Sequence, residues 1–175
     1  VCKLSLPWEK LRGKSVMLSG ATGLIGSFFV DVISEKNITD GLNCTVYALV
    51  RNEEKAKARF SKFADDPHLI FIPYDVKYPL VTDTPEKIDY ILHLASNTHP
   101  MLYATDPIGT ITTNIIGLQN LLEFAAEHRC ERFIFASSNE VYGENRGDAE
   151  LFDEDYCGYI NCNTLRAGYP ESKRC

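Results

Sequence analysis

Tyr169 and Lys173 lie four residues apart near the end of this 175-residue sequence. Side chains at positions i and i+4 lie on the same face of a helix, so a helix here would put an ammonium group beside a phenol. A neighbouring cation lowers the pKa of a phenol toward the range of an acid–base catalyst. Pro170 favours a helix that begins at this point. Because such pairs also occur by chance, this one needs support from other motifs.

Three glycines, Gly20, Gly23 and Gly26, form a loop between a predicted strand and a predicted helix. Glycine lets the backbone turn tightly and approach a pyrophosphate, whose charge meets the free N–H groups at the helix start. The spacing and context therefore indicate a dinucleotide site. A glycine-rich turn without a ligand is the alternative.

The end of the second predicted strand bears on which dinucleotide binds. An acidic residue there usually binds the ribose hydroxyls of NAD, but this strand ends at Val50 and is followed by Arg51 and Asn52. Without a carboxylate, and with a guanidinium group available, a 2′-phosphate would be tolerated. NAD and NADP are therefore equally open. Arg51 could instead stack on adenine or face solvent.

Strand-like and helix-like segments alternate along the chain. The predicted strands cover 15–19, 44–50, 69–72, 90–94 and 132–136, and the predicted helices cover 24 to about 35, 53–63 and 107–128. Asp106 and Pro107 supply the N-cap and first residue of the long helix, whose apolar residues recur at steps of three and four. Near-continuous apolar strands separated by helices indicate a parallel sheet covered on both faces. We predict an α/β fold, a Rossmann-type doubly wound sheet with strand order 3-2-1-4-5.

Composition excludes several classes of protein. The net charge of -6 argues against a nucleic-acid partner, and the 45% apolar and 24% charged content is ordinary for a soluble globular domain. The six cysteines form no C-x-x-C pair, so we expect no metal site and reduced thiols in a cytoplasmic protein. No apolar run reaches membrane-spanning length and no signal-peptide core is present. Five acidic residues within 148–155 indicate a solvated loop.

Four motifs in order resemble the extended short-chain dehydrogenase/reductases, the NAD-dependent epimerase/dehydratase family that modifies sugar nucleotides. They are the glycine loop, segments 93–96 and 137–143, and Tyr169 with Lys173. Within that group the chain most resembles the UDP-glucuronate decarboxylases, through segments 93–96, 106–117, 154–161 and 166–169.

The resemblance implies roles for individual residues. Tyr169 would take the proton of the sugar 4-hydroxyl, and Lys173 would hold the nicotinamide ribose and keep the phenol acidic. Ser138 would hydrogen-bond the reacting oxygen. Asn114 could help order the site, or it could be a buried asparagine that binds backbone.

The resemblance also implies a set of cofactor contacts. Asp75 and Val76, after the third strand, would hold adenine, although Asp75 could be an ordinary turn aspartate. The predicted cofactor-binding residues are Gly20, Thr22, Gly23, Leu24, Ile25, Gly26, Arg51, Asp75, Val76, Leu94, Ala95, Ser96, Asn114, Tyr169 and Lys173.

Glu140 bears on the net reaction. By resemblance, dehydratases and decarboxylases carry a glutamate here, whereas a plain 4-epimerase needs none. Oxidation at C4 turns a C5 carboxylate into a β-keto acid, which loses carbon dioxide readily. Asn139 replaces the aspartate of some 4,6-dehydratases, which counts mildly against that class. A salt-bridged structural carboxylate is the alternative role for Glu140.

We therefore expect a nucleotide-sugar enzyme that oxidises C4 with bound NAD or NADP, with decarboxylation the favoured outcome. The alternatives are a 4,6-dehydratase or 4-epimerase, an NADPH-dependent carbonyl reductase, and a non-enzymatic dinucleotide sensor. Family members normally continue into a C-terminal substrate domain and form homodimers. We thus expect residues 1–175 to be the NAD(P)-binding Rossmann portion, inactive by itself.

Overall fold

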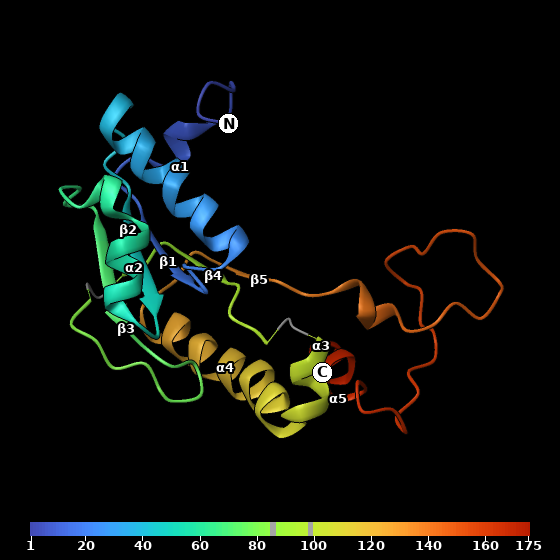
Figure 1. Cartoon of the computed structure of the whole chain (residues 1–175). Helices are drawn as coiled ribbons and strands as arrows, with labels where there is room; N and C mark the ends of the chain where they lie inside the picture. Colours follow the sequence, from blue (N-terminus) through green and yellow to red (C-terminus); the bar gives the residue numbers. More distant parts are fainter. Residues whose placement is uncertain (85–86, 98–99) are drawn as a thin grey trace.

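The computed structural model describes residues 1–84, 87–97 and 100–175. Its centre is a parallel sheet in which β1 lies between β2 and β4, with β3 and β5 at the two edges (Figure 1). The strand order β3-β2-β1-β4-β5 confirms the predicted topology. The strands are β1 (Ser15–Ser19), β2 (Thr45–Val50), β3 (Leu69–Pro73), β4 (Tyr90–His93) and β5 (Arg132–Phe135).

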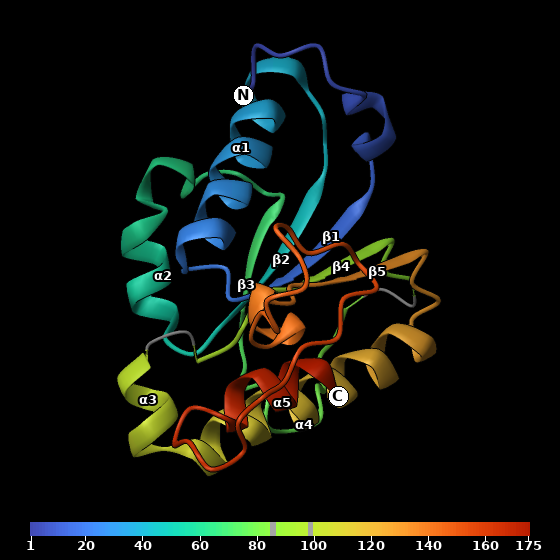
Figure 2. The same ribbon diagram turned by 90° about the vertical axis from the view of Figure 1, so that its right-hand side faces the viewer.

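Helices cover both faces of the sheet. Figure 2 shows α1 and α2 on one side, and α4 with α3 and α5 on the other. The helices are α1 (Leu24–Asp40), α2 (Glu53–Arg59), α3 (Pro100–Thr105), α4 (Pro107–Glu127) and α5 (Gly168–Arg174). Three short 3-10 turns complete the described elements: η1 (Trp8–Leu11), η2 (Ser61–Phe63) and η3 (Asn139–Tyr142).

Alternate residues of β1 belong to two separate hydrophobic cores, because successive side chains of a strand point to opposite faces. Val16 and Leu18 pack in a cluster with Val30 of α1, while Met17 packs in a second cluster with Leu121 of α4. Burying a side chain of this size contributes about 1.5–3 kcal/mol. The central strand is therefore apolar on both faces, as a sheet covered on both sides requires.

Two predicted helix ends differ from the structure. The first helix runs to Asp40 rather than to about residue 35, and it ends where Gly41 adopts a left-handed conformation with φ of 57°. Glycine closes a helix in this way at little steric cost. The predicted helix over 53–63 is split, since α2 ends at Arg59 and η2 follows.

Two further differences concern α5 and α3. Helix α5 begins at Gly168 rather than at Pro170, which lies within its first turn. Proline is accepted there because the first-turn N–H groups have no partner inside the helix. Helix α3 was not predicted, since its six residues are too few to show a helical period.

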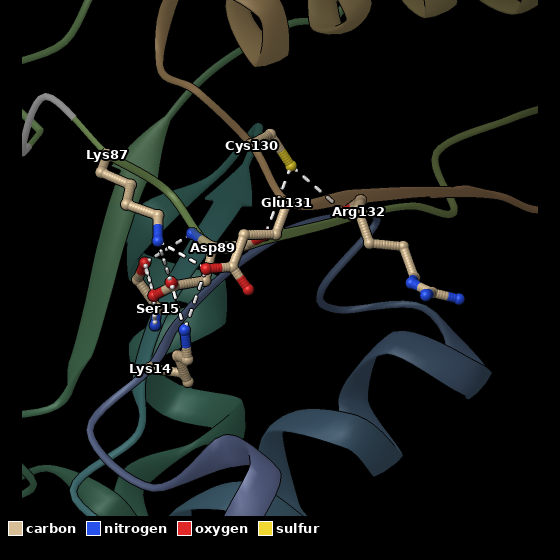
Figure 3. A network of polar contacts seen from close by, with 7 residues as sticks. All are labelled: Lys14, Ser15, Lys87, Asp89, Cys130, Glu131 and Arg132. Carbon is tan, nitrogen blue, oxygen red and sulfur yellow. Dashed lines mark hydrogen bonds and ion pairs between the residues drawn. The ribbon is translucent and has the colours of Figure 1, made fainter.

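A polar network joins the amino ends of β1, β4 and β5 (Figure 3). The Asp89 carboxylate accepts hydrogen bonds of 2.9 Å from Lys14 Nζ and from both the backbone N–H and the hydroxyl of Ser15. Lys14 Nζ also lies 3.0 Å from Glu131 Oε1. Burial opposes ionisation of Asp89, but the bonds from Lys14, Ser15 and Lys87 outweigh it and hold its pKa well below the usual range.

Three further observations concern membrane spans, metal ligands and the state of the cysteines. No helix among the described residues is long and apolar enough to cross a membrane. Within the same residues, no group of three His, Cys, Asp or Glu side chains could hold a metal ion. All six cysteines lie in the described part and are free thiols.

Candidate active site

The carboxyl ends of the strands border a cleft of about 760 Å³. This volume lies within the range of small-molecule and cofactor pockets. We call it the carboxyl-edge cleft, and its walls come from the segments that follow all five strands and from α5. The predicted cofactor residues that line it are Gly20, Thr22, Gly23, Leu24, Ile25, Gly26, Arg51, Asp75, Val76, Leu94, Ala95, Ser96, Tyr169 and Lys173.

The glycine loop makes a tight turn that requires glycine, because side chains at two of its positions would collide with backbone. Gly20 has φ of 71°, and a Cβ there would lie 2.9 Å from the backbone nitrogen of Ala95. A Cβ on Gly26 would run into the carbonyl oxygen of Gly20. Gly23 is the N-cap of α1, so the N–H groups of the first helical turn, which lack helical acceptors, border the cleft.

The segment after β3 forms the other end of the cleft. Asp75 lines it while its carboxylate also accepts the backbone N–H of Lys77 at 3.1 Å, so the turn role and the cleft position coexist. Helix α4 fixes the backbone at Val76, because Asn120 Nδ2 donates to the carbonyl oxygen of Val76 at 2.8 Å. A Cβ on Gly117 would lie only 2.9 Å from the Val76 side chain, so glycine lets α4 come this close.

Asn114 lies outside the cleft lining and is only 1% exposed. Its Oδ1 accepts the hydroxyl of Ser96 at 2.8 Å, and its Nδ2 donates to the hydroxyl of Ser172 at 2.9 Å. Ser172 in turn donates to the carbonyl oxygen of Tyr169 at 2.9 Å. Asn114 therefore connects a cleft-lining loop to the helix that carries Tyr169, through side chains rather than through backbone.

Lys173 is 7% exposed and reaches the cleft from α5. Its Nζ donates to the carbonyl oxygen of Ala136 at 2.8 Å and lies 4.2 Å from the ring centre of Phe135. Burial lowers the pKa of Lys173 to about 8. The end of β5 thus fixes the ammonium group at the cleft, on the same helix as Tyr169 and one turn away from it.

Tyr169 is 6% exposed and stacks on Tyr103 of α3, with ring centres 4.4 Å apart and an angle of 15° between the planes. The Arg166 guanidinium lies 5.7 Å from the centre of the Tyr103 ring. The same guanidinium pairs with Glu140 at 2.9 Å. Three residues therefore connect the phenol of Tyr169 to η3.

Ser138 and Glu140 flank the cleft without lining it. The Ser138 hydroxyl caps η3 by accepting the N–H of Glu140 at 3.2 Å. Arg174 Nε donates to the carbonyl oxygen of Val141 at 2.8 Å and so ties η3 to α5. All four predicted catalytic residues thus lie on two elements that are joined to each other, and Glu140 is ion-paired.

Sequence reasoning missed Tyr103, Arg166, Ser172 and Lys77. Tyr103 sits in a helix too short to predict, and Arg166 precedes Tyr169 in a segment with no regular period. Lys77 lines the cleft two residues after Asp75. That spacing is a local signal for Lys77, and Arg166 begins segment 166–169, which carries part of the family resemblance.

The fold and the site together define a dinucleotide-binding α/β protein with a tyrosine–lysine pair. The chain belongs to the NAD dependent epimerase/dehydratase family, which it matches over residues 16–175. It is 31% identical over 159 residues to UDP-glucuronic acid decarboxylase 5 of Arabidopsis thaliana. The matched region covers 91% of this chain and 43% of that protein. It is 35% identical over 167 residues to UDP-glucuronic acid decarboxylase 1 of Danio rerio, covering 95% and 36%. The chain therefore spans less than half the length of these relatives.

Solved structures share the fold. The dTDP-glucose 4,6-dehydratase DesIV of Streptomyces venezuelae, solved with NAD, has a TM-score of 0.68 at 24% identity, covering 91% of this chain and 48% of that one. The yeast methylglyoxal/isovaleraldehyde reductase Gre2, solved with NADPH, has a TM-score of 0.68 at 20% identity, covering 91% and 49%. The matched family is NAD dependent, and these two neighbours were solved with NAD and with NADPH. The glycine loop described above, with the free N–H groups at the start of α1, fits the pyrophosphate of such a dinucleotide.

Proposed function

We propose that the whole protein oxidises the sugar of a nucleotide sugar at C4, and that its net reaction is decarboxylation of a UDP-glucuronate-like substrate. The observation that carries this proposal is the position of Tyr169 and Lys173 in the same cleft as the glycine loop. A dinucleotide in that cleft would lie close to the phenol of Tyr169 and the ammonium group of Lys173, which are one turn apart on α5. The decarboxylases that are about 30% identical to the chain support the choice of substrate.

In this mechanism Tyr169 accepts the proton of the C4 hydroxyl. Lys173 faces the same cleft with a pKa lowered by burial to about 8, so at pH 7 it is mostly charged and favours the phenolate electrostatically. A bound nicotinamide would supply the removal of hydride from C4 and its later return. The Ser138 hydroxyl accepts the Glu140 N–H and donates to Asn139 Oδ1 at 3.5 Å, and it would exchange this long bond for one to the reacting oxygen.

Glu140 would act after the oxidation. A ketone at C4 makes a C5 carboxylate a β-keto acid, so loss of carbon dioxide needs no further oxidant. The pair between Glu140 and Arg166 is connected to Tyr169 through the ring of Tyr103. We assign Glu140 to substrate positioning or to the step that follows oxidation, with its carboxylate held by Arg166.

The test of the function is a panel of nucleotide sugars incubated with the whole protein and either NAD or NADP. We expect carbon dioxide and a pentose nucleotide from UDP-glucuronate, measured by mass spectrometry. Water loss from a neutral hexose nucleotide would instead identify a dehydratase, and inversion at C4 alone would identify an epimerase. A protein that binds dinucleotide but converts no sugar would support the sensing alternative.

Variants of Tyr169 and Glu140 should fail at different steps. Tyr169→Phe should abolish the reduced-nicotinamide signal with every sugar, because the C4 proton has no acceptor. Glu140→Gln should still form reduced cofactor and 4-keto sugar while losing final product. Glu144→Gln, an exposed glutamate of the adjoining segment, is the matched control. Unchanged turnover and products in Glu140→Gln would remove the local support for decarboxylation.

A second candidate, an NADPH-dependent carbonyl reductase, is favoured by Arg51. This side chain is exposed, lines the cleft directly after β2, and replaces the carboxylate typical of NAD sites. Oxidation of NADPH by simple aldehydes and ketones, without any need for a nucleotide sugar, would distinguish this reductase from the leading proposal.

A further inference from the structure

His93, the last residue of β4, is a buried histidine for which the proposed mechanism has no role. It is 0% exposed, and its Nδ1 lies 2.6 Å from the hydroxyl oxygen of Ser19, the residue opposite it on β1. Ser19 is itself 1% exposed and directly precedes Gly20 of the glycine loop. His93 therefore joins the strand that leads into the glycine loop to the strand that leads into Leu94 and Ala95.

The neighbours of the Ser19 hydroxyl define the direction of this hydrogen bond. Its oxygen accepts the backbone N–H groups of Leu94 and Ala95, each at 3.2 Å. A hydroxyl group has two acceptor lone pairs and one proton, so two N–H donors leave the proton to be donated to His93 Nδ1. Since a ring nitrogen that accepts a hydrogen bond carries no proton, the neutral imidazole is protonated on Nε2.

The surroundings of His93 also favour the neutral ring. Its ring centre lies 6.4 Å from that of Phe133 and 5.5 Å from that of Phe135. Within the residues that the structure describes, the buried Nε2 has no hydrogen-bond partner, and a charged ring without a partner is costly in such a place. In agreement, burial lowers the pKa of His93 to about 4, and the charge of Lys173 acts in the same direction.

The backbone and the ring of His93 extend this connection to Lys173. The carbonyl oxygen of His93 accepts the N–H of Ala136 at 3.0 Å, and the carbonyl oxygen of Ala136 accepts Lys173 Nζ at 2.8 Å. The ring of His93 stacks on that of Phe135, whose centre lies 4.2 Å from the same Nζ. Because Ser19 and Lys173 both line the carboxyl-edge cleft, His93 connects two of its walls from behind.

We propose that His93 is a positioning residue for the bound dinucleotide, and that its neutral form, by accepting the Ser19 hydroxyl at Nδ1, holds the backbone of Leu94 and Ala95 against Gly20. The approach is close, since a Cβ on Gly20 would lie 2.9 Å from the backbone nitrogen of Ala95. This role rests on the dinucleotide site of the proposed function and on no step of the sugar chemistry. The two ideas can therefore fail separately.

The first test is the position of the His93 proton in the protein without ligand. Histidine labelled with nitrogen-15 in the ring gives different NMR correlation patterns for the two neutral tautomers and for the imidazolium ion. The His93 signals are identified by their proximity to the ring protons of Phe135. At pH 7 we expect a neutral ring with its proton on Nε2. A proton on Nδ1 would overturn the proposal, because Ser19 could not then donate to that nitrogen.

The second test compares two substitutions that remove different parts of the His93 side chain. His93→Phe keeps an aromatic ring and loses the acceptor. His93→Asn loses the ring but can place Oδ1 where histidine carries Nδ1, since both atoms are bonded to Cγ. Binding of NAD and of NADP is titrated by calorimetry. We expect His93→Phe to weaken the tighter of the two about tenfold, the effect of one lost hydrogen bond, and His93→Asn to retain most of the affinity.

Ser19→Ala removes the other partner of the same bond. It should weaken binding about as much as His93→Phe, and the double variant should bind no more weakly than Ser19→Ala alone, because both substitutions remove one interaction. His68→Phe is the matched control. His68 Nδ1 lies 3.1 Å from the hydroxyl oxygen of Thr45 in the same kind of pair, outside the cleft, so its loss should leave the affinity unchanged.

A side chain that only filled space would give the opposite order of the two His93 variants. Affinity kept in His93→Phe and lost in His93→Asn would therefore contradict the proposal, as would an equal loss in His68→Phe. The position of the His93 proton is measured on the unsubstituted protein, so it decides the matter even if the variants do not fold.

Discussion

Arg51 is the residue that we predict to influence the choice between NAD and NADP. It follows β2, lines the carboxyl-edge cleft and is exposed, and the adjacent Asn52 is occupied as the N-cap of α2. The first carboxylates after the strand, Glu53 and Glu54, already belong to α2. We therefore predict that this end of the cleft accepts a 2′-phosphate as well as the ribose hydroxyls of NAD.

Replacing Arg51 by alanine tests this directly. If the guanidinium binds a 2′-phosphate, Arg51→Ala should weaken NADP binding by about 1.5–3 kcal/mol, the usual contribution of a charged hydrogen bond, and leave NAD binding unchanged. Both cofactors are titrated by calorimetry. Arg59→Ala is the control, since Arg59 belongs to the same region but pairs with Asp31 outside the cleft. Equal losses for NAD and NADP would argue for stacking on adenine instead.

Individual residues also show how much of the site could be predicted from the sequence. Tyr169 and Lys173 could be recognised because their spacing within one helix is a local property. The connection from Tyr103 through Arg166 to Glu140 could not, because its members come from three segments that only folding brings together. Asn114 was predicted to contact cofactor or to help order the site. Its amide hydrogen-bonds two serines, and contact with the cofactor stays a prediction.

At the scale of elements, the strands were easier to predict than the helices. Each strand is a short apolar run, and the predicted and observed bounds differ by at most one residue. Helix ends depend on single backbone conformations, such as the left-handed Gly41, and on packing partners elsewhere in the chain. Those determinants are not contained in the hydrophobic period of the helix itself.

The pairing of β1 with β4 at their amino ends depends on Asp89 (Figure 3). Its pKa is lower in the folded chain than in the unfolded chain, so its contribution to stability is present above the unfolded pKa of about 3.9. That contribution is lost progressively as the pH falls below this value. The ionised carboxylate binds Lys14 and Ser15 at once, and protonation weakens both contacts.

Asp89→Asn should therefore lower the free energy of unfolding at pH 7 by about 1–3 kcal/mol, the cost of losing a charged hydrogen bond. It should also flatten the dependence of stability on pH below about 4. Urea unfolding at pH 7 and in mildly acidic steps measures both effects. Asp65→Asn, at an exposed aspartate, is the matched control. Parallel pH curves for the Asp89 variant and the unchanged chain would contradict this role.

At the scale of the whole molecule, the amino ends and the carboxyl ends of the strands carry different groups of residues. The amino ends carry the ion-pair network, and the carboxyl ends carry the cleft and the tyrosine–lysine pair. Helix α4 joins the parts, since it packs on the sheet and against both α3 and α5. The proposed chemistry thus sits on segments that the sheet holds from one side and α4 from the other.

One segment departs from this arrangement. Residues 143–167 leave the body of the molecule between η3 and α5, as the orange and red trace of Figure 1 shows. The base of the excursion is tied down, because Gly158 N donates to the carbonyl oxygen of Tyr142 at 2.7 Å and Arg174 Nη2 donates to that of Gly158. Its outer part carries Glu150 and Glu154, both exposed.

We predict that a protease can cleave the chain within this excursion and that the two fragments then stay associated. A glutamate-specific protease should cut first within 145–156, because exposed loop tips are the preferred sites of nicking. Helix α5 would stay docked, since Tyr169, Pro170, Ser172 and Lys173 are buried. Limited digestion should thus give two bands on a denaturing gel but one peak by gel filtration; dissociation into two peaks would contradict this. A severed backbone would leave Tyr169 and Lys173 facing the cleft, held there by packing alone.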